Sequence, residues 1–140
     1  MTRIDFYVLA TARPQERERV ACRLVEKARQ HDQTVYIHVE SSAQAAALDE
    51  LLWTFRQQSF IPHARAGADA DAPVLIGCGD DMPPAGRALL INLDADVPLF
   101  FSGFERVMEI IDGDDQRRAQ GRSRFRFYQD RGYPLQTHKL

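Results

Sequence analysis

Arginine residues recur every four positions near the C-terminus, at Arg118, Arg122 and Arg126, and Phe125 lies among them. Side chains four residues apart lie on one face of a helix, and Phe125 is three residues beyond Arg122 on the same side. A guanidinium group can bind a carboxylate through two hydrogen bonds, and a neighbouring aromatic ring offers an apolar surface. These residues therefore predict a site for an acidic peptide that ends in an aromatic residue. The alternative is a solvated arginine face with Phe125 in the core.

The charge of the chain is divided unevenly along its length. Residues 116–140 contain seven basic residues and one acidic residue, a net charge of +6, whereas the remainder contains 11 basic and 19 acidic residues, a net charge of −8. Such a distribution attracts an anion to one surface while the rest of the molecule resists unspecific adhesion to nucleic acid. We therefore expect an anionic partner. The alternative function is direct nucleic-acid binding, with the C-terminal arginine helix contacting phosphates.

A second candidate surface is indicated by aromatic residues in the middle of the chain. Trp53 stands at the end of a predicted helix, and Phe60 and Pro62 lie in the connection that follows. Large apolar side chains at such positions are often partly exposed and act as interface anchors. The alternative is that Trp53 packs on the loop and closes the core.

Catalytic and ligand-binding motifs are missing from the sequence. Neither a phosphate-binding loop nor a glycine-rich dinucleotide turn occurs, and the Gly-Cys-Gly segment at 77–79 is too short to hold a pyrophosphate. The strongest enzyme candidate is Asp94-Ala95-Asp96, because a phosphoaspartyl transferase uses two aspartates directly after a strand. Such an enzyme also needs a downstream lysine, and the only lysine after this segment is Lys139. The histidines and cysteines lack the spacing of a metal site. We expect no catalytic residue, cofactor or metal.

Strands and helices alternate along the predicted chain. Apolar runs typical of buried strands occur at 4–9, 34–39, 74–77, 88–93 and 106–111. Helices are predicted over 15–30, over 43–55 with Ser41 or Ser42 as N-cap, and from the caps Asp114 or Asp115 to about Arg131, before Gly132. Strands that are apolar throughout indicate a parallel sheet covered on both faces. The predicted fold class is α/β, a three-layer α/β/α arrangement with a mostly parallel sheet of about five strands and a loop at 64–72.

Length and composition fit one domain that spans residues 1–140. Hydrophobic residues make up 44% and charged residues 27%, as in ordinary globular proteins. The apolar runs are far shorter than the roughly 20 residues of a membrane span, and the first residues make a poor signal peptide. We therefore expect a cytoplasmic protein in which Cys22 and Cys78 are buried, inert thiols.

The order and spacing of several segments resemble the family of chi subunits of bacterial DNA polymerase III holoenzyme. The matching segments are Phe6-Tyr7-Val8-Leu9, Leu48-Asp49-Glu50-Leu51-Leu52-Trp53, Ser59-Phe60-Ile61-Pro62-His63, and the pattern Arg118, Arg122, Phe125, Arg126, Gly132. The resemblance covers nearly the whole chain. It implies a three-layer fold related to helicase motor domains but without a phosphate loop, and a non-catalytic adaptor of the polymerase III clamp-loader complex.

The resemblance also implies two partners. The positions that bind the acidic C-terminal tail of single-stranded DNA-binding protein in the family are occupied here by Arg118, Arg122, Phe125 and Arg126. The surface that meets the psi subunit, or alternatively a helicase-like repair protein, is matched by Trp53, Phe60 and Pro62. Phe125 replaces a tyrosine, and two arginines replace lysines, which preserves charge and stacking but alters hydrogen-bond geometry. Association with DNA would be indirect.

Overall fold

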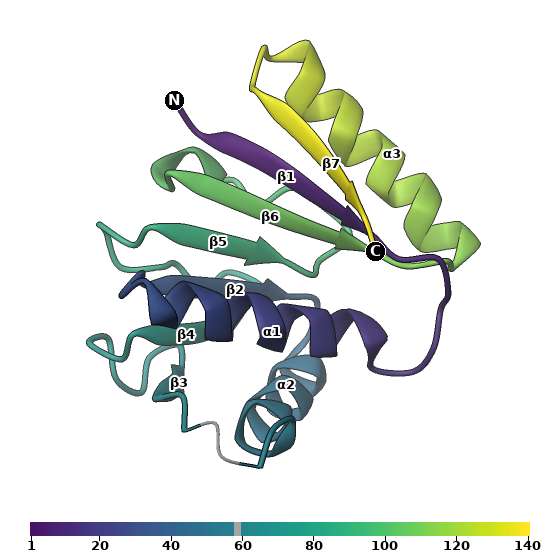
Figure 1. Cartoon of the computed structure of the whole chain (residues 1–140). Helices are drawn as coiled ribbons and strands as arrows, with labels where there is room; N and C mark the ends of the chain where they lie inside the picture. The colour runs from purple at the N-terminus through teal and green to yellow at the C-terminus, as the bar shows by residue number, and fades with distance from the viewer. Residues whose placement is uncertain (58–59) are drawn as a thin grey trace.

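The computed structural model describes residues 1–57 and 60–140 and has an α/β fold (Figure 1). In this part of the chain one sheet contains seven strands: β1 (Arg3–Val8), β2 (Val35–Val39), β3 (His63–Arg65), β4 (Val74–Cys78), β5 (Leu89–Asn92), β6 (Arg106–Ile111) and β7 (Leu135–Lys139). The helices are α1 (Glu16–Gln30), α2 (Ser42–Thr54), α3 (Asp115–Asp130) and the short 3-10 helix η1 (Phe101–Gly103). The strand order is β3-β4-β2-β5-β6-β1-β7, and every neighbouring pair is parallel. The predicted fold class is confirmed.

The sheet has helices on both faces, which gives three layers (Figure 1). On one face α1 and α2 cover a core that includes Val25, Leu48 and Ile91. On the other face α3 covers a second core, to which Phe6 and Tyr128 belong. The second core also includes aromatic residues in and next to η1, so this segment shares the face with α3. The sheet is thus buried on both sides, as strands of uniformly apolar sequence require.

Local sequence explains where the helices begin and which side they bury. In α1, buried residues at helical spacing face the sheet, namely Val20, Ala21, Val25 and Ala28. Ser41 caps α2 because its hydroxyl accepts a hydrogen bond from the Gln44 N–H. Asp114 caps α3 in the same way by accepting from the Arg117 N–H. Each cap contributes about 1 kcal/mol, and both residues were among the predicted caps.

The sheet has two strands more than the sequence predicted. β3 has only three residues and pairs with β4, so the predicted loop at 64–72 begins too early. β7 follows Gly132, where no element was expected. It pairs with β1 at one edge of the sheet, and its sequence, Leu-Gln-Thr-His-Lys, is mostly polar because much of an edge strand stays in contact with solvent. Both strands lack the long apolar run on which the prediction rested.

Candidate functional site

A groove lies between α3 and the edge of the sheet. The helix ends at Asp130, and Gly132, with φ of 76°, turns the chain back into β7 beside β1. The groove has a volume of about 250 Å³. Its lining is mainly apolar and includes two arginines; the lining residues are Phe6, Val8, Ile111, Arg118, Gly121, Arg122, Phe125 and Thr137. The helix and the strand edge together therefore make a recess with an apolar floor and basic side chains.

Three of the four residues predicted on the arginine face line this groove, and the fourth does not. Phe125 is half-buried, and its ring centroid lies 5.3 Å from that of Phe6, so it packs on the core and still borders the groove. Arg122 is exposed at the groove. Arg126 is also exposed, but it is not part of the groove lining. Helical spacing thus placed the residues on one side of α3, while the packing of α3 beside β1, β6 and β7 decided which of them line the recess.

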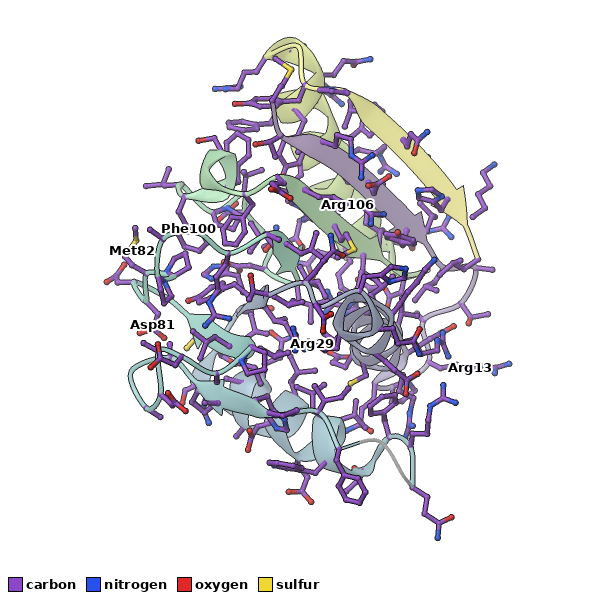
Figure 2. The ribbon with its side chains drawn as sticks, turned by 60° about the vertical axis from the view of Figure 1, so that its left-hand side comes forward. Arg13, Arg29, Asp81, Met82, Phe100 and Arg106 are labelled. Atoms are coloured by element: carbon purple, nitrogen blue, oxygen red, sulfur yellow. The ribbon has the colours of Figure 1, made fainter. Side chains whose placement is uncertain are left out.

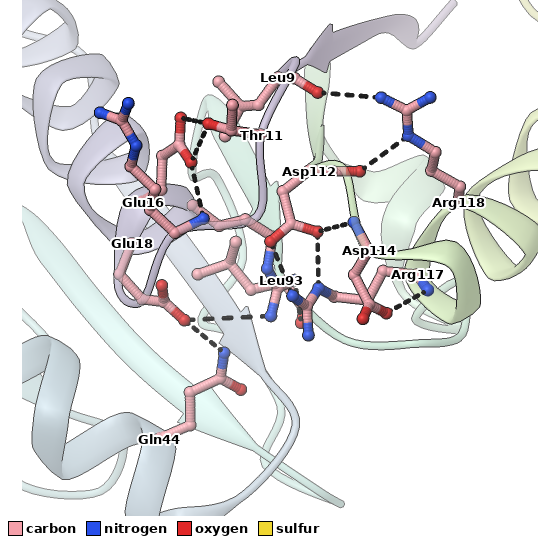
Figure 3. Close-up of polar contacts among 12 residues, drawn as sticks. Leu9, Thr11, Glu16, Glu18, Gln44, Leu93, Asp112, Asp114, Arg117 and Arg118 are labelled. Atoms are coloured by element: carbon pink, nitrogen blue, oxygen red, sulfur yellow. Dashed lines mark hydrogen bonds and ion pairs between the residues drawn. The ribbon is translucent and has the colours of Figure 1, made fainter.

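The arginines at the beginning of α3 differ in their partners (Figure 3). Arg118 is half-buried, and its Nε and Nη2 donate to the carbonyl oxygens of Asp112 at 3.3 Å and Leu9 at 3.4 Å. Arg117 instead donates two hydrogen bonds of 2.7 Å to the Asp112 carboxylate. Burial by itself raises the pKa of Asp112, but the hydrogen bonds and charge of Arg117 bring that pKa below its usual value. Arg117 is therefore an internal counter-ion, that is, its charge is paired with an acidic residue of the same chain.

Arg124 is a second internal counter-ion of α3. Its Nε donates to the fully buried Glu109 carboxylate at 2.8 Å, and its Nη1 donates to the Ala95 carbonyl at 2.8 Å. Sequence reasoning missed these pairs because the acidic partners lie in β6 and directly after it, before the basic segment begins. The net charge of +6 counted over 116–140 therefore overstates the charge of this surface.

The turn between β1 and α1 is closed by a carboxylate of the chain itself (Figure 3). The Glu16 side chain accepts hydrogen bonds from the Thr11 hydroxyl at 2.8 and 2.9 Å and from the Arg13 N–H at 3.0 Å. In α/β folds, backbone N–H groups at such a helix N-terminus can hold a phosphate. Here the negative charge of Glu16 occupies the turn, and it would repel a phosphate.

The second predicted surface lies at the other edge of the sheet, beside α2 and β3 (Figure 1). Trp53 is 52% exposed and Phe60 is 83% exposed, so neither is closed into the core. Pro62 is exposed too, whereas Ser59 of the same motif lies outside the described residues. The Trp53 ring centroid lies 4.3 Å from that of His63, to which sequence reasoning gave no role. The only sequence feature that pointed to a role for His63 was its position in the Ser-Phe-x-Pro-His segment.

The two aspartates considered for enzyme chemistry differ in their surroundings. Asp94 Oδ2 lies 3.1 Å from Nε2 of the buried His38, and its Oδ1 accepts from the Ala95 N–H at 2.7 Å. Asp96 is exposed. Within the described residues, we find neither a cluster of three His, Cys, Asp or Glu side chains suited to a metal ion nor a helix with the length and apolar character of a membrane span.

Arg13, Arg29 and Arg106 are basic residues that do not line the α3 groove (Figure 2). Arg106 lies on the sheet, where its Nε donates to the Asp5 carboxylate, while Arg29 and Arg13 belong to α1 and to the turn before it. Arg29 donates to the Gln33 carbonyl at 2.9 Å. Arg106 also lines a second recess, together with Lys27 and apolar residues that include Leu24 and Met108. The α3 groove differs from it in containing three of the residues predicted from the sequence.

Sequence comparison identifies relatives along almost the entire chain. A family model described as DNA polymerase III chi subunit, HolC, matches residues 1–136. DNA polymerase III subunit chi of Pseudomonas aeruginosa is 48% identical over 141 residues, covering 100% of this chain and 98% of its own. The chi subunits of Haemophilus influenzae and Escherichia coli are each 30% identical, over 97% and 86% of this chain and 96% and 83% of their own.

Solved structures with the same fold are much more distant in sequence. T4 UvsW superposes with a TM-score of 0.73 at 10% identity, covering 99% of this chain and 41% of its own. Saccharomyces cerevisiae Dbp5, solved with RNA and ADP BeF3, gives a TM-score of 0.67 at 9% identity, covering 98% and 41%. The chain spans less than half the length of these proteins, and the likeness concerns the RecA-like fold alone. By the whole-chain family match and the close relatives, the chain belongs to the DNA polymerase III chi subunit family and is an accessory protein of DNA replication.

Proposed function

We propose that this chain is a non-catalytic adaptor of the polymerase III clamp-loader complex, with one protein partner at each edge of its sheet. The first partner is the acidic C-terminal tail of single-stranded DNA-binding protein, bound in the groove beside α3. The second partner is the psi subunit or a helicase-like repair protein, bound at Trp53, Phe60 and Pro62. The observation that carries the proposal is the groove itself, where an exposed and a half-buried arginine border an apolar floor.

The groove offers both kinds of surface that an acidic peptide with an aromatic end requires. Arg122 has no ion-pair partner within the described chain, so its guanidinium is available to a carboxylate. A hydrogen bond to a charged group contributes about 1.5–3 kcal/mol. Phe125, Phe6 and Ile111 provide apolar surface for the aromatic side chain, which gains further from ring contacts of about 0.5–1.5 kcal/mol. We expect micromolar affinity, roughly −8 kcal/mol.

The two surfaces are placed so that both partners can bind at once. β7 and β3 are opposite edges of the sheet, and α3 and α2 cover opposite faces (Figure 1). This separation supports simultaneous binding of the two proposed partners. This arrangement suits tethering, in which the polymerase assembly is held near template coated with single-stranded DNA-binding protein and no covalent bond is made or broken.

Calorimetric titration with a short acidic peptide ending in Asp-Ile-Pro-Phe tests the groove. Wild-type protein should bind, and the Arg122→Ala/Phe125→Ala double variant should lose binding. Arg23→Ala is the matched control, because Arg23 is an exposed arginine of α1, on the other face of the sheet, and its loss should leave the affinity unchanged. A wild-type protein that does not bind the peptide would contradict the proposal.

The rival function, direct nucleic-acid binding by α3, makes a different prediction. Phosphate contacts would give an affinity that falls steeply with salt and depends little on Phe125. The rival is weakened because Arg117 and Arg124 are internal counter-ions and offer little charge to phosphates. Binding of a single-stranded oligonucleotide that persists in Phe125→Ala but not in Arg122→Ala would favour the rival.

A further inference from the structure

His63, the first residue of β3, lies against the indole ring of Trp53. The His63 side chain is 0% exposed, while the neighbouring Trp53 is 52% exposed. The two ring centroids are 4.3 Å apart, with 44° between the ring planes. One side of the indole therefore rests on a fully buried imidazole, and more than half of its surface remains open to a partner.

The imidazole of His63 connects both halves of the exposed surface. Its Nδ1 lies 2.7 Å from the carbonyl oxygen of Ile61, in the connection that carries the other two predicted anchors. Its Nε2 lies 3.2 Å from the carbonyl oxygen of Asp49 and 3.1 Å from the Asp49 carboxylate. Asp49 and Trp53 are four residues apart in α2 and project from the same side of the helix. The His63 ring thus contacts two residues of α2, Asp49 and Trp53, and one residue of the connection, Ile61.

The His63 ring has polar partners on both sides. The carbonyl oxygen of Ile61 lies beside Nδ1, and the carbonyl and carboxylate oxygens of Asp49 lie beside Nε2. Arg65 of the same strand donates to the Ser42 hydroxyl instead. The imidazole is therefore held between α2 and the connection that leads into β3.

We propose that His63 is the positioning residue of this docking surface: held between Asp49 and the Ile61 carbonyl, it fixes Trp53 and the Ile61 connection in the geometry that the psi subunit binds. The inference rests on the proposed role of Trp53, Phe60 and Pro62 in partner docking. Loss of the imidazole removes the hydrogen-bonded links to both segments and the ring contact on one side of the indole. Psi binding therefore depends on the imidazole of His63.

Positioning strengthens binding because an ordered anchor loses less freedom when the partner arrives. An unsupported Trp53 would have to be immobilised by the partner, which costs affinity. His63→Gln keeps a polar side chain but removes the ring that contacts the indole. We expect this variant to bind a purified psi subunit about tenfold more weakly, which corresponds to about 1.4 kcal/mol, while peptide binding in the α3 groove stays unchanged.

The emission of Trp53 tests the positioning without any partner. Trp53 is the only tryptophan of the chain, so the intrinsic fluorescence reports on this residue alone. An indole that rests on a buried ring moves less than one without that support. The fluorescence anisotropy of Trp53 should therefore decay faster in His63→Gln than in the wild type.

The matched control is His31→Gln, which removes an exposed histidine at the end of α1. This variant should keep the wild-type anisotropy decay and the wild-type affinity for psi. An anisotropy decay that is equal in the wild type and in His63→Gln would overturn the positioning role, and this result needs no partner. Wild-type protein that shows the slower decay but does not bind psi would refute the proposed docking function instead. Equal psi affinity of the wild type and His63→Gln would overturn the link between positioning and binding.

Discussion

Replacing Arg124 should destabilise the protein more than replacing any exposed arginine of α3. Arg124 is 6% exposed and its partner Glu109 is 0% exposed, so water screens this pair very little. The Glu109 carboxylate also accepts hydrogen bonds from Tyr128 at 2.8 Å and Asn92 at 3.0 Å. Arg124→Met keeps the apolar stem of the side chain but leaves Glu109 as a buried charge without its counter-ion.

The expected loss follows from the two hydrogen bonds that Arg124 donates. The bond to Glu109 joins two charged groups, which contributes about 1.5–3 kcal/mol, and the bond to the Ala95 carbonyl contributes about as much. Breaking a buried ion pair from one side costs about 3–5 kcal/mol overall. A domain of this size has a free energy of unfolding of about 5–15 kcal/mol. Arg124→Met should therefore lose a large fraction of the stability.

Urea denaturation of four proteins measures this effect. The set contains the wild type, Arg124→Met, Glu109→Gln/Arg124→Met and the exposed control Arg122→Met. The double variant should be more stable than Arg124→Met because a neutral amide still bonds Tyr128 and no charge remains buried. The control should stay within about 0.5 kcal/mol of the wild type. The reasoning is refuted if Arg124→Met loses less than about 1 kcal/mol or if Glu109→Gln does not recover stability.

Three further predictions concern pH, packing and thiol reactivity. The pKa of Asp112 is raised by burial but lowered overall by Arg117, from 3.8, so its stabilisation is present above about pH 4 and is lost as pH falls further; Asp112→Asn should flatten the acid limb of a stability curve. A Cβ at Gly77 would lie 1.8 Å from the hydroxyl of buried Tyr36, so Gly77→Ala should cost about 1–3 kcal/mol in urea and Tyr36→Phe should recover part of it. Burial raises the pKa of the Cys22 thiol to about 12. Mass spectrometry of the native protein should therefore show alkylation only at Cys78, which is half-buried.

The local elements could be predicted because their determinants are neighbours along the chain. The apolar residues of α1, the caps Ser41 and Asp114, and the apolar run of β2 all act within a few residues. The alternation of these elements also determined the α/β class, since apolar parallel strands need cover on both faces. The sequence contains no phosphate-binding motif. In the structure, the Glu16 carboxylate occupies the turn between β1 and α1, where such a motif could hold a phosphate.

The candidate groove was predictable only in part. The spacing of Arg118, Arg122 and Phe125 places them on one side of α3, because helical geometry repeats every 3.6 residues. Arg126 follows the same spacing but lies outside the groove, whose lining opposite α3 comes from β1, β6 and β7. The net charge counted over residues 116–140 overstated the charge of this surface. Two of its arginines form ion pairs with acidic residues that precede Asp114 in the chain.

By itself the sequence determined the three α-helices, the strands other than β3 and β7, the fold class and the side of α3 that carries arginines. These depend on contacts between residues a few positions apart. The tertiary structure alone decided that polar β7 pairs with β1, more than 100 residues away, that Glu109 holds Arg124, and that His63 supports Trp53. Such contacts form between residues that no periodicity relates. They exist only once the sheet has brought distant strands and helices side by side.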